Sequence, residues 1–248
     1  RNLEKRLVWS VTGKIAYNKN VILKLSDALK EDTRKALAEN IELGTLLFEG
    51  DPTNAIYAVR SLGIDPSTGK ELYLTKDGEI TETWKSSDRV FLGSYDPKYR
   101  GNISSLFQWG GLSINLAFGY HFGGYQYNST LLSKVEINKN MISAGNVDKR
   151  VYEDRWQKPG DVKFFKKIDD KSTKATSRFV MKESVFELQN VSLQYTFDGP
   201  KFKEKTKMQA LLIGLNMSEI LYLSTIRLER GTGYPYARHA ALSLSVTF

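Results

Sequence analysis

The fold class is decided by residues 109–120, which read WGGLSINLAFGY. After the Gly110-Gly111 pair, larger apolar residues occupy every second position, which is the period of a β-strand with one apolar face. These residues are Leu112, Ile114, Leu116, Phe118 and Tyr120, and they alternate with Ser113, Asn115, Ala117 and Gly119. A second alternating run, 103–109, ends at the two glycines. A Gly-Gly connection between such runs predicts an antiparallel β-hairpin.

Other segments alternate in the same way along the chain. They are residues 9–17, 191–197, 209–217 and 240–248. In 209–217 the pattern is blurred, because Leu211, Leu212 and Ile213 are all apolar. Together with the hairpin, the sequence predicts six antiparallel strands and an all-β fold.

The connections between these segments differ in length. Gly110-Gly111 and residues 198–207 are short, whereas residues 18–101, 121–189 and 218–238 are long, polar and charged. Short and long connections alternate, as in outer-membrane barrels with tight periplasmic turns and long extracellular loops. A soluble β-sandwich also has alternating strands, but it has no reason to alternate its connections. We therefore predict a segment of a transmembrane antiparallel β-barrel with Gly110-Gly111 on the periplasmic side.

Aromatic residues mark both ends of the predicted strands. Trp9, Trp109, Phe197 and Phe248 fall at the periplasmic end, and Tyr17 and Tyr120 fall at the opposite end. Two aromatic rings separated by an apolar band are typical of barrels whose outer face meets lipid. We therefore expect Ile114, Leu116 and Phe118 to face lipid.

Two polar residues interrupt the apolar pattern of the fourth segment. Glu187 and Gln189 continue the register of Val191, so either they lie above the apolar band or a bulge separates them from it. The sequence favours a position above the band.

Six strands are too few to close a transmembrane barrel, since the smallest have about 8. We therefore expect residues 1–248 to be the C-terminal part of a longer polypeptide whose N-terminal strands and plug are absent from this chain. The final strand ends in Leu244, Val246 and Phe248. This pattern resembles the C-terminal signal read by the barrel-assembly machinery.

The composition argues against an enzyme, a cofactor and a metal site. The 248 residues include no Cys, which excludes thiolate metal sites and cysteine nucleophiles. They include only two His, which leaves little material for a metal site or a catalytic triad. Residues 63–70 miss the phosphate-loop spacing and residues 65–78 miss the calcium-loop spacing, so we expect turns beside a short strand at 71–75. His121 and His239 continue the polar faces of their strands and are predicted to line a pore.

The net charge of +8 arises from 36 Lys+Arg and 28 Asp+Glu. These charges are dispersed through the loops without an aromatic platform, so we expect solvated loops near lipid headgroups and no nucleic-acid partner. The longest apolar run, 210–215, is far shorter than the roughly 20 residues of a membrane-spanning helix. Residues 27–42 predict a helix that either packs within its loop or lies on a partner. Its apolar face would contain Leu29, Ala36, Leu37 and Ile41.

Short motifs occur in order along nearly the whole chain. They are NKN at 18–20, GIDPSTGK at 63–70, KDG at 76–78, LG at 92–93, PKYRG at 97–101, DRWQKPGD at 154–161, SRFV at 177–180, LQNVSL at 188–193, GLN at 214–216 and VTF at 246–248. In this combination the chain resembles the SusC/RagA family of TonB-dependent outer-membrane transporters. The stretch at 21–91 departs from the commoner form of that family.

The resemblance implies a location in the outer membrane of a Gram-negative bacterium and a complete barrel of about 22 strands with a plugged lumen. It also implies import of glycans or peptides together with a SusD-like surface lipoprotein, with the plug and the TonB-contacting segment upstream of this chain. An alternative is a SusC-like barrel retained as a scaffold in a larger outer-membrane assembly. An outer-membrane hydrolase would need a Ser/His/Asp cluster, which the sequence does not show.

Aromatic residues of the second long loop are candidates for contact with substrate or with the lipoprotein lid. They are Tyr125, Tyr127 and Trp156. Aromatic planes stack on sugars, but loop tyrosines also serve as ordinary packing residues. The sequence leaves both interpretations open.

Overall fold

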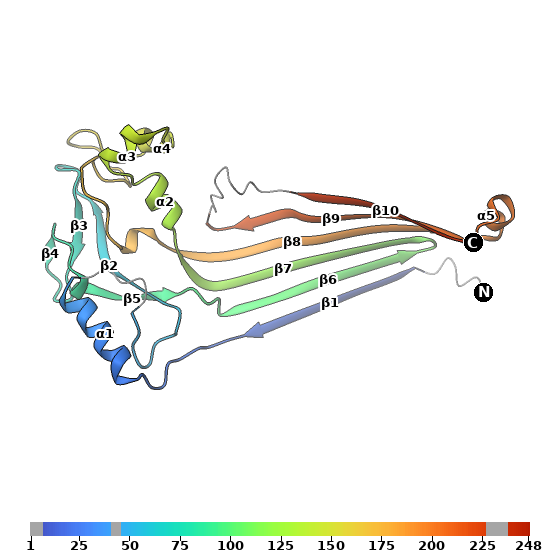
Figure 1. The fold of residues 1–248 in the computed structure, drawn as a ribbon, viewed down its shortest axis with the longest axis horizontal. Helices are drawn as coiled ribbons and strands as arrows, with labels where there is room; N and C mark the ends of the chain where they lie inside the picture. The colour runs from blue at the N-terminus through green and yellow to red at the C-terminus, as the bar shows by residue number, and fades with distance from the viewer. Residues whose placement is uncertain (1–6, 41–45, 227–237) are drawn as a thin grey trace. The chain divides into compact units, whose positions relative to one another are not determined.

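The computed structural model describes residues 7–40, 46–226 and 238–248 (Figure 1). The chain divides into two compact units. The first, which we call the strand unit, consists of Arg1–Asn18, Lys98–Gly123 and Ser184–Phe248. The second, the loop unit, consists of Lys19–Pro97 and Gly124–Glu183. The two predicted long loops before residue 184 therefore fold together into a unit of their own.

A six-stranded sheet forms the strand unit, in the order β1-β6-β7-β8-β9-β10 (Figure 1). Its strands are β1 (Val8–Tyr17), β6 (Tyr99–Trp109), β7 (Leu112–Tyr127), β8 (Val180–Phe197), β9 (Ala210–Ser224) and β10 (His239–Thr247). The pairs β1/β6, β6/β7, β8/β9 and β9/β10 are antiparallel. Each predicted segment corresponds to one of these strands to within one residue at its ends or lies inside it, so the prediction of six strands in chain order is confirmed. β6, β7, β8 and β9 extend further towards the loops than strict alternation indicated.

The register places the apolar residues of neighbouring strands on one face. Ile114 of β7 lies opposite Phe107 of β6, and Phe118 lies opposite Ile103. Because directly opposed residues share a face of the sheet, the apolar side predicted from the sequence is continuous from strand to strand. We call this side the apolar face and the opposite side the polar face.

The pairing of β8 with β9 contains a bulge. Asn190 lies opposite Ser218 and Leu188 lies opposite Leu221, so one residue of β8 faces two residues of β9. One of those two, Glu219, has a φ of 54°, a left-handed conformation that suits a bulge. The regular alternation therefore ends at this point.

The bulge explains where Glu187 and Gln189 lie. A Cβ added at Gly119, on the polar face, would meet the Glu187 carboxylate and the Gln189 amide. Phe186 instead stacks on Phe118 of the apolar face, with 5.5 Å between the ring centroids. The prediction that both polar residues lie above the apolar band is wrong, because the break in register turns their side chains towards the polar face.

The short connection at 198–207 contains a helix rather than only a turn. α5 (Pro200–Thr206) begins after the extended residue Gly199 and has Pro200 in its first turn, where proline is favoured. It ends at Lys207, which has a left-handed φ of 60°. Alternation of apolar and polar residues cannot reveal this helix, because Phe202 is its one large apolar side chain.

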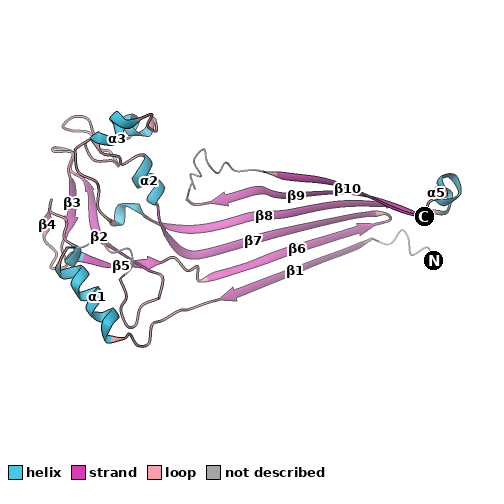
Figure 2. Cartoon of the chain, in the orientation of Figure 1, coloured by secondary structure: helices cyan, strands magenta, loops and turns pink. Residues whose placement is uncertain are grey.

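The loop unit contains a second sheet, in the order β4-β3-β2-β5 (Figure 2). Its strands are β2 (Ala55–Ile64), β3 (Glu71–Leu74), β4 (Ile80–Thr81) and β5 (Arg89–Ser94). Its helices are α1 (Asp27–Ala38), α2 (Ser129–Lys134), α3 (Lys139–Ala144), α4 (Arg150–Glu153) and the 3₁₀ turns η2 (Ser86–Asp88) and η3 (Ser177–Phe179). The short strand predicted at 71–75 is confirmed as β3. The other strands of this sheet were not predicted.

The helix predicted at 27–42 is confirmed as the shorter α1. The Ser26 hydroxyl caps its N-terminus by accepting a hydrogen bond from the Leu29 amide at 3.4 Å. On the predicted apolar face, Ala36 is buried, Leu37 is half-buried and Leu29 is exposed. Ile41 lies outside the described residues. Burial of Ala36 favours a helix packed within its own unit.

β1 and β10 are the two edges of the six-stranded sheet, each hydrogen-bonded to one neighbour among the described strands. In lipid, an edge with unpaired backbone groups costs several kcal/mol per group, so a sheet of this kind in a membrane would need further strands at both edges. We expect residues 1–248 expressed alone to aggregate in detergent and to show no heat-modifiable mobility on electrophoresis. A monodisperse, heat-modifiable monomer of this chain would contradict the six-strand count.

Candidate functional site

The apolar face of the strand unit is strongly exposed. At the sheet edges, Trp9 of β1 is 70% exposed and Leu242 of β10 is 77% exposed. Ile15 and Leu244 are exposed to a similar degree. A soluble monomer rarely leaves such a continuous apolar surface in water, so this face requires an apolar environment.

Aromatic rings border the loop end of the apolar face. Tyr17 contacts Tyr99 at a centroid distance of 5.2 Å, and Tyr99 stacks on Phe122 at 5.0 Å. The Tyr120 ring covers Gly101, and its hydroxyl donates to the Lys14 carbonyl at 3.0 Å. A side chain at Gly101 would collide with that ring, so the glycine makes room for it.

The hairpin end of the sheet has its own aromatic residues. Trp9 lies opposite Phe107 in β6, and Trp109 lies opposite Leu112 across the Gly-Gly turn. Tyr195 and Phe197 of β8 follow at this end, with 4.5 Å between their ring centroids. The predicted placement of aromatic residues at both strand ends is therefore confirmed.

The C-terminal residues complete this end of the sheet. Leu244 lies opposite Ile213 and Val246 lies opposite Leu211, so both belong to the apolar face. Phe248 follows the last residue of β10 and is 83% exposed. The structure thus places the three residues of the predicted assembly signal at the hairpin end, and their role in assembly stays a prediction.

The polar face contains small and hydrophilic side chains. Lys14 lies opposite Asn102, and Ser192 lies opposite Asn216. His121 lies opposite Arg100 and therefore on the polar face of β7. His239 is the first residue of β10 and is exposed. The position of His121 on the polar face is therefore established, and the lining of a lumen by this face stays a prediction.

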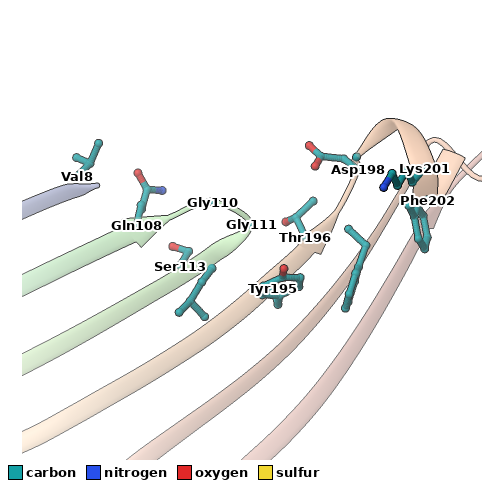
Figure 3. Close-up of a pocket in the computed structure, with 13 residues that line it drawn as sticks. Val8, Gln108, Gly110, Gly111, Ser113, Tyr195, Thr196, Asp198, Lys201 and Phe202 are labelled. Carbon is teal, nitrogen blue, oxygen red and sulfur yellow. The ribbon is translucent and has the colours of Figure 1, made fainter. Parts of the chain in front are cut away.

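A recess of about 890 Å³ opens at the hairpin end (Figure 3). The Gly111 carbonyl accepts a hydrogen bond from the Thr196 amide at 2.9 Å, which joins the hairpin to the end of β8. Figure 3 shows Gln108, Thr196 and Asp198 on one side of the strands and Tyr195 and Phe202 on the other. The recess therefore combines a polar side, an aromatic side and the start of α5.

A buried ionic cluster lies in the loop unit. Arg178 donates from Nη2 to Glu71 and to Glu136, at 2.7 Å in both cases. The three side chains are 5%, 1% and 0% exposed, respectively. The Arg178 guanidinium also lies 4.7 Å from the centre of the Phe179 ring and donates to the Phe164 carbonyl at 2.6 Å. A single cation thereby joins β3, η3 and the segment after α2.

The environment of this cluster shifts the pKa of neighbouring groups. Burial alone would lower the pKa of Arg178, but the hydrogen bonds that it donates to Glu71 and Glu136 raise it above its ordinary value. Burial raises the pKa of the Tyr73 hydroxyl, and the negative charge of Glu71 adds to that shift. Arg178 therefore stays charged and Tyr73 stays neutral throughout the physiological range.

A second buried arginine supports the same region. Arg155 is 2% exposed and donates to the backbone carbonyls of Val135 and Ile137. Burial lowers the pKa of its guanidinium, while the nearby charges of Glu136 and Asp169 oppose that shift. It fixes the chain beside the apolar core of this unit, which consists of Val135, Ile137, Val151, Phe165 and Phe179.

The aromatic candidates of the second long loop have separate packing partners. The Tyr125 ring lies against Gly93. The Tyr127 ring packs on the apolar core, with its centroid 6.2 Å from that of Phe179. The Trp156 ring covers Gly69, and its indole nitrogen donates to the Pro66 carbonyl at 2.9 Å. Packing accounts for all three rings, and contact with substrate stays a prediction.

Sequence reasoning did not single out the buried ionic cluster. Along the chain, Arg178 is 42 residues from Glu136 and 107 residues from Glu71, so no local spacing indicates the cluster. The available signal was the pair of motifs DRWQKPGD at 154–161 and SRFV at 177–180, which contain the buried Arg155 and Arg178. A charged residue within such a motif is a better guide than the loop tyrosines.

Within residues 7–40, 46–226 and 238–248, the structure contains no group of three or more His, Asp or Glu side chains arranged to hold a metal ion. In the same described part of the chain, no helix has the length and apolarity needed to cross a bilayer.

No protein-family model and no curated protein matches this chain. Solved structures do match it. A structure of the RagAB peptide transporter matches with a TM-score of 0.69 and 20% identity, over 89% of this chain and 24% of that chain. A structure of the RagAB peptide importer in the 'open-open' state matches with a TM-score of 0.72 and 18% identity, over 100% of this chain and 27% of that chain.

The importer in its 'closed-closed' state matches with a TM-score of 0.61 and 19% identity, over 88% of this chain and 24% of that chain. This chain therefore spans about a quarter of the length of the solved chains that it matches. At this level of identity the likeness establishes the fold: an all-β, antiparallel barrel segment similar to part of these transporter structures.

Proposed function

We propose that this chain forms part of the wall and outer loops of an outer-membrane transporter of the SusC/RagA type. The observation that carries the proposal is the exposed apolar face, bounded by aromatic residues at both strand ends, in a sheet whose fold is similar to part of the RagAB importer structures. In this proposal Ile114, Leu116 and Phe118 face lipid, and the polar face lines the lumen. The chain has no chemistry of its own.

The loop unit lies outside the membrane in this proposal and contributes to the contact with a SusD-like surface lipoprotein and with substrate. The buried Arg178 cluster links three segments of this unit to one another. Tyr125 and Trp156 are half-buried, so each retains an accessible edge. Tyr127 belongs to the core of the unit and stabilises it. Energy for transport would come through TonB, by way of the part of the polypeptide outside this chain.

The substrate class is peptides or glycans, and uptake distinguishes them. We expect cells that produce the full polypeptide to accumulate a fluorescent oligopeptide or oligosaccharide, and cells that lack it to accumulate neither. A protonophore should abolish the accumulation, because TonB-dependent import requires the proton gradient. Equal uptake with and without the polypeptide, at equal outer-membrane integrity, would refute the transport function.

Deletion of Phe248 from the full polypeptide is expected to reduce barrel insertion far more than deletion of Tyr125. The lost burial of one interfacial ring is worth only about 1 to 3 kcal/mol, a small part of a large barrel's stability. Loss of a recognition signal would instead block entry to the assembly pathway. The measurement compares outer-membrane yield with the unfolding temperature of the protein that does insert. Normal yield with a lowered unfolding temperature would leave Phe248 with a packing role only.

A further inference from the structure

The helix α5 gathers positive charge at the hairpin end of the strand unit. Its lysines, together with the residue that ends the helix, are Lys201, Lys203, Lys205 and Lys207. Asp198 and Glu204 are the acidic residues of the same connection, so the lysines outnumber them two to one. In the described part of the chain, none of these lysines forms an ion pair with a carboxylate. Their charge is therefore available to an anion from outside the chain.

An aromatic ladder leads from the apolar face to this helix. Tyr195 contacts Phe197 at 4.5 Å, and Phe197 stacks on Phe202 of α5 at 5.9 Å, measured between ring centroids. Tyr195 and Phe197 are both exposed, and they continue the apolar row of Val191 and Leu193 along β8. The apolar face therefore does not end at the strand but continues onto the lysine-bearing helix.

The recess beside the ladder has room for a small polar group. It has a volume of about 890 Å³ and is lined by the Gly110-Gly111 turn, by the ladder and by Lys201 (Figure 3). A Cβ at Gly111 would collide with the Thr196 carbonyl and would lie 3.4 Å from the Tyr195 ring. The absence of a side chain at this position therefore lets the hairpin lie close to β8.

We propose that this end of the strand unit binds the headgroup of an anionic phospholipid, with the phosphate near the α5 lysines and the upper acyl chain along Tyr195 and Phe197. This inference rests on the proposed function, which places the hairpin end at the inner surface of the outer membrane. Lysines beside a bilayer surface attract anionic lipids, and aromatic rings occupy the interface between headgroups and acyl chains. An acidic protein or a free anion would use the lysines but would have no use for a ladder continuous with the lipid-facing surface.

The first test uses the unaltered full polypeptide. It is reconstituted in bilayers of phosphatidylethanolamine with a minor fraction of phosphatidylglycerol, and the lipids retained on the protein are measured by native mass spectrometry. We expect phosphatidylglycerol to be enriched over its fraction in the bilayer. Retention in proportion to that fraction would overturn the proposal. Release of the bound lipid by millimolar inorganic phosphate alone would also overturn it, because it would show a free-anion site.

The second test locates the site by comparing two quadruple lysine-to-glutamine variants, which remove the same number of positive charges from different parts of the chain. The quadruple variant Lys201→Gln, Lys203→Gln, Lys205→Gln and Lys207→Gln should lose the enrichment by about tenfold. The matching lysine-to-arginine variant should keep it, because the charge remains. The control variant Lys24→Gln, Lys76→Gln, Lys85→Gln and Lys158→Gln removes exposed lysines of the loop unit and should also keep it. Equal loss in the α5 variant and the control would refute a site at α5.

Failure of this inference can be told apart from failure of the proposed function. If the full polypeptide inserts in the bilayer and imports substrate but shows no preference for phosphatidylglycerol, the lipid site is wrong and the transporter assignment stands. If the unaltered polypeptide does not insert in a bilayer at all, the transporter assignment is wrong, and the lipid site falls with it.

Discussion

Replacing Arg178 by methionine in the full polypeptide is expected to destabilise the loop unit by about 3 to 5 kcal/mol. The guanidinium forms ion pairs with both Glu71 and Glu136, whose side chains are almost completely buried. Without it, two carboxylates would remain close together and away from water. The substitution should therefore open the loop unit and leave the strand unit folded. Hydrogen exchange in the loop unit, compared with exchange in the strands, measures the effect.

A matched control comes from an exposed ion pair of the same length. Arg34 donates to Glu31 at 2.7 Å, but the two side chains are 70% and 42% exposed. Arg34→Met should cost no more than about 1 kcal/mol, because water solvates both charges in either state. A triple variant, Arg178→Met with Glu71→Gln and Glu136→Gln, should recover part of the loss, since no carboxylate of the cluster is then left buried without Arg178. Similar effects of Arg178→Met and Arg34→Met would show that burial does not govern the cluster.

The strand unit could be predicted because its determinants are local. Alternation along residues 112–120 and the adjoining Gly-Gly turn indicates a hairpin without reference to any other part of the chain. The bulge at Glu219 could not be predicted in the same way. The polar residues Glu187 and Gln189 indicate that the pattern of β8 is interrupted, but only the pairing of β8 with β9 shows that the cause is a bulge.

The loop unit was less predictable because its contacts are distant in sequence. The first half of β2 is mostly buried and β4 has only two residues, so neither shows clear alternation. The ionic cluster joins residues from three separate segments, and only the fold brings them together. For the aromatic candidates, the residue type suggested a contact role, whereas the fold gives each ring a packing partner. Tyr127 was chosen for its residue type, but its neighbours Val135 and Phe179 make it a core residue.

The substitution Leu116→Arg in the full polypeptide is expected to destabilise the barrel by about 2 to 4 kcal/mol if the apolar face meets lipid. Leu116 lies in the middle of the regular part of β7, opposite Ser105 of β6 and far from both aromatic ends. An arginine at this depth must either lose its hydration or drag water into the bilayer. The cost falls towards the membrane surfaces, so Leu112→Arg at the hairpin end should be considerably milder.

Asn115→Arg is the matched control, because it adds the same charge one residue away on the polar face, opposite Leu106. It should change stability little, since a lumen is hydrated. Urea unfolding in lipid vesicles measures both variants. Single cysteines provide a second readout: those at Ile114 and Phe118 should be shielded from a water-soluble reagent, and those at Ser113 and Ala117 should react. Equal destabilisation by the two arginines, together with equal aqueous labelling of the two faces, would mean that the apolar face does not meet lipid. The membrane assignment therefore depends on which environment each face of the sheet meets, and not on the number of strands.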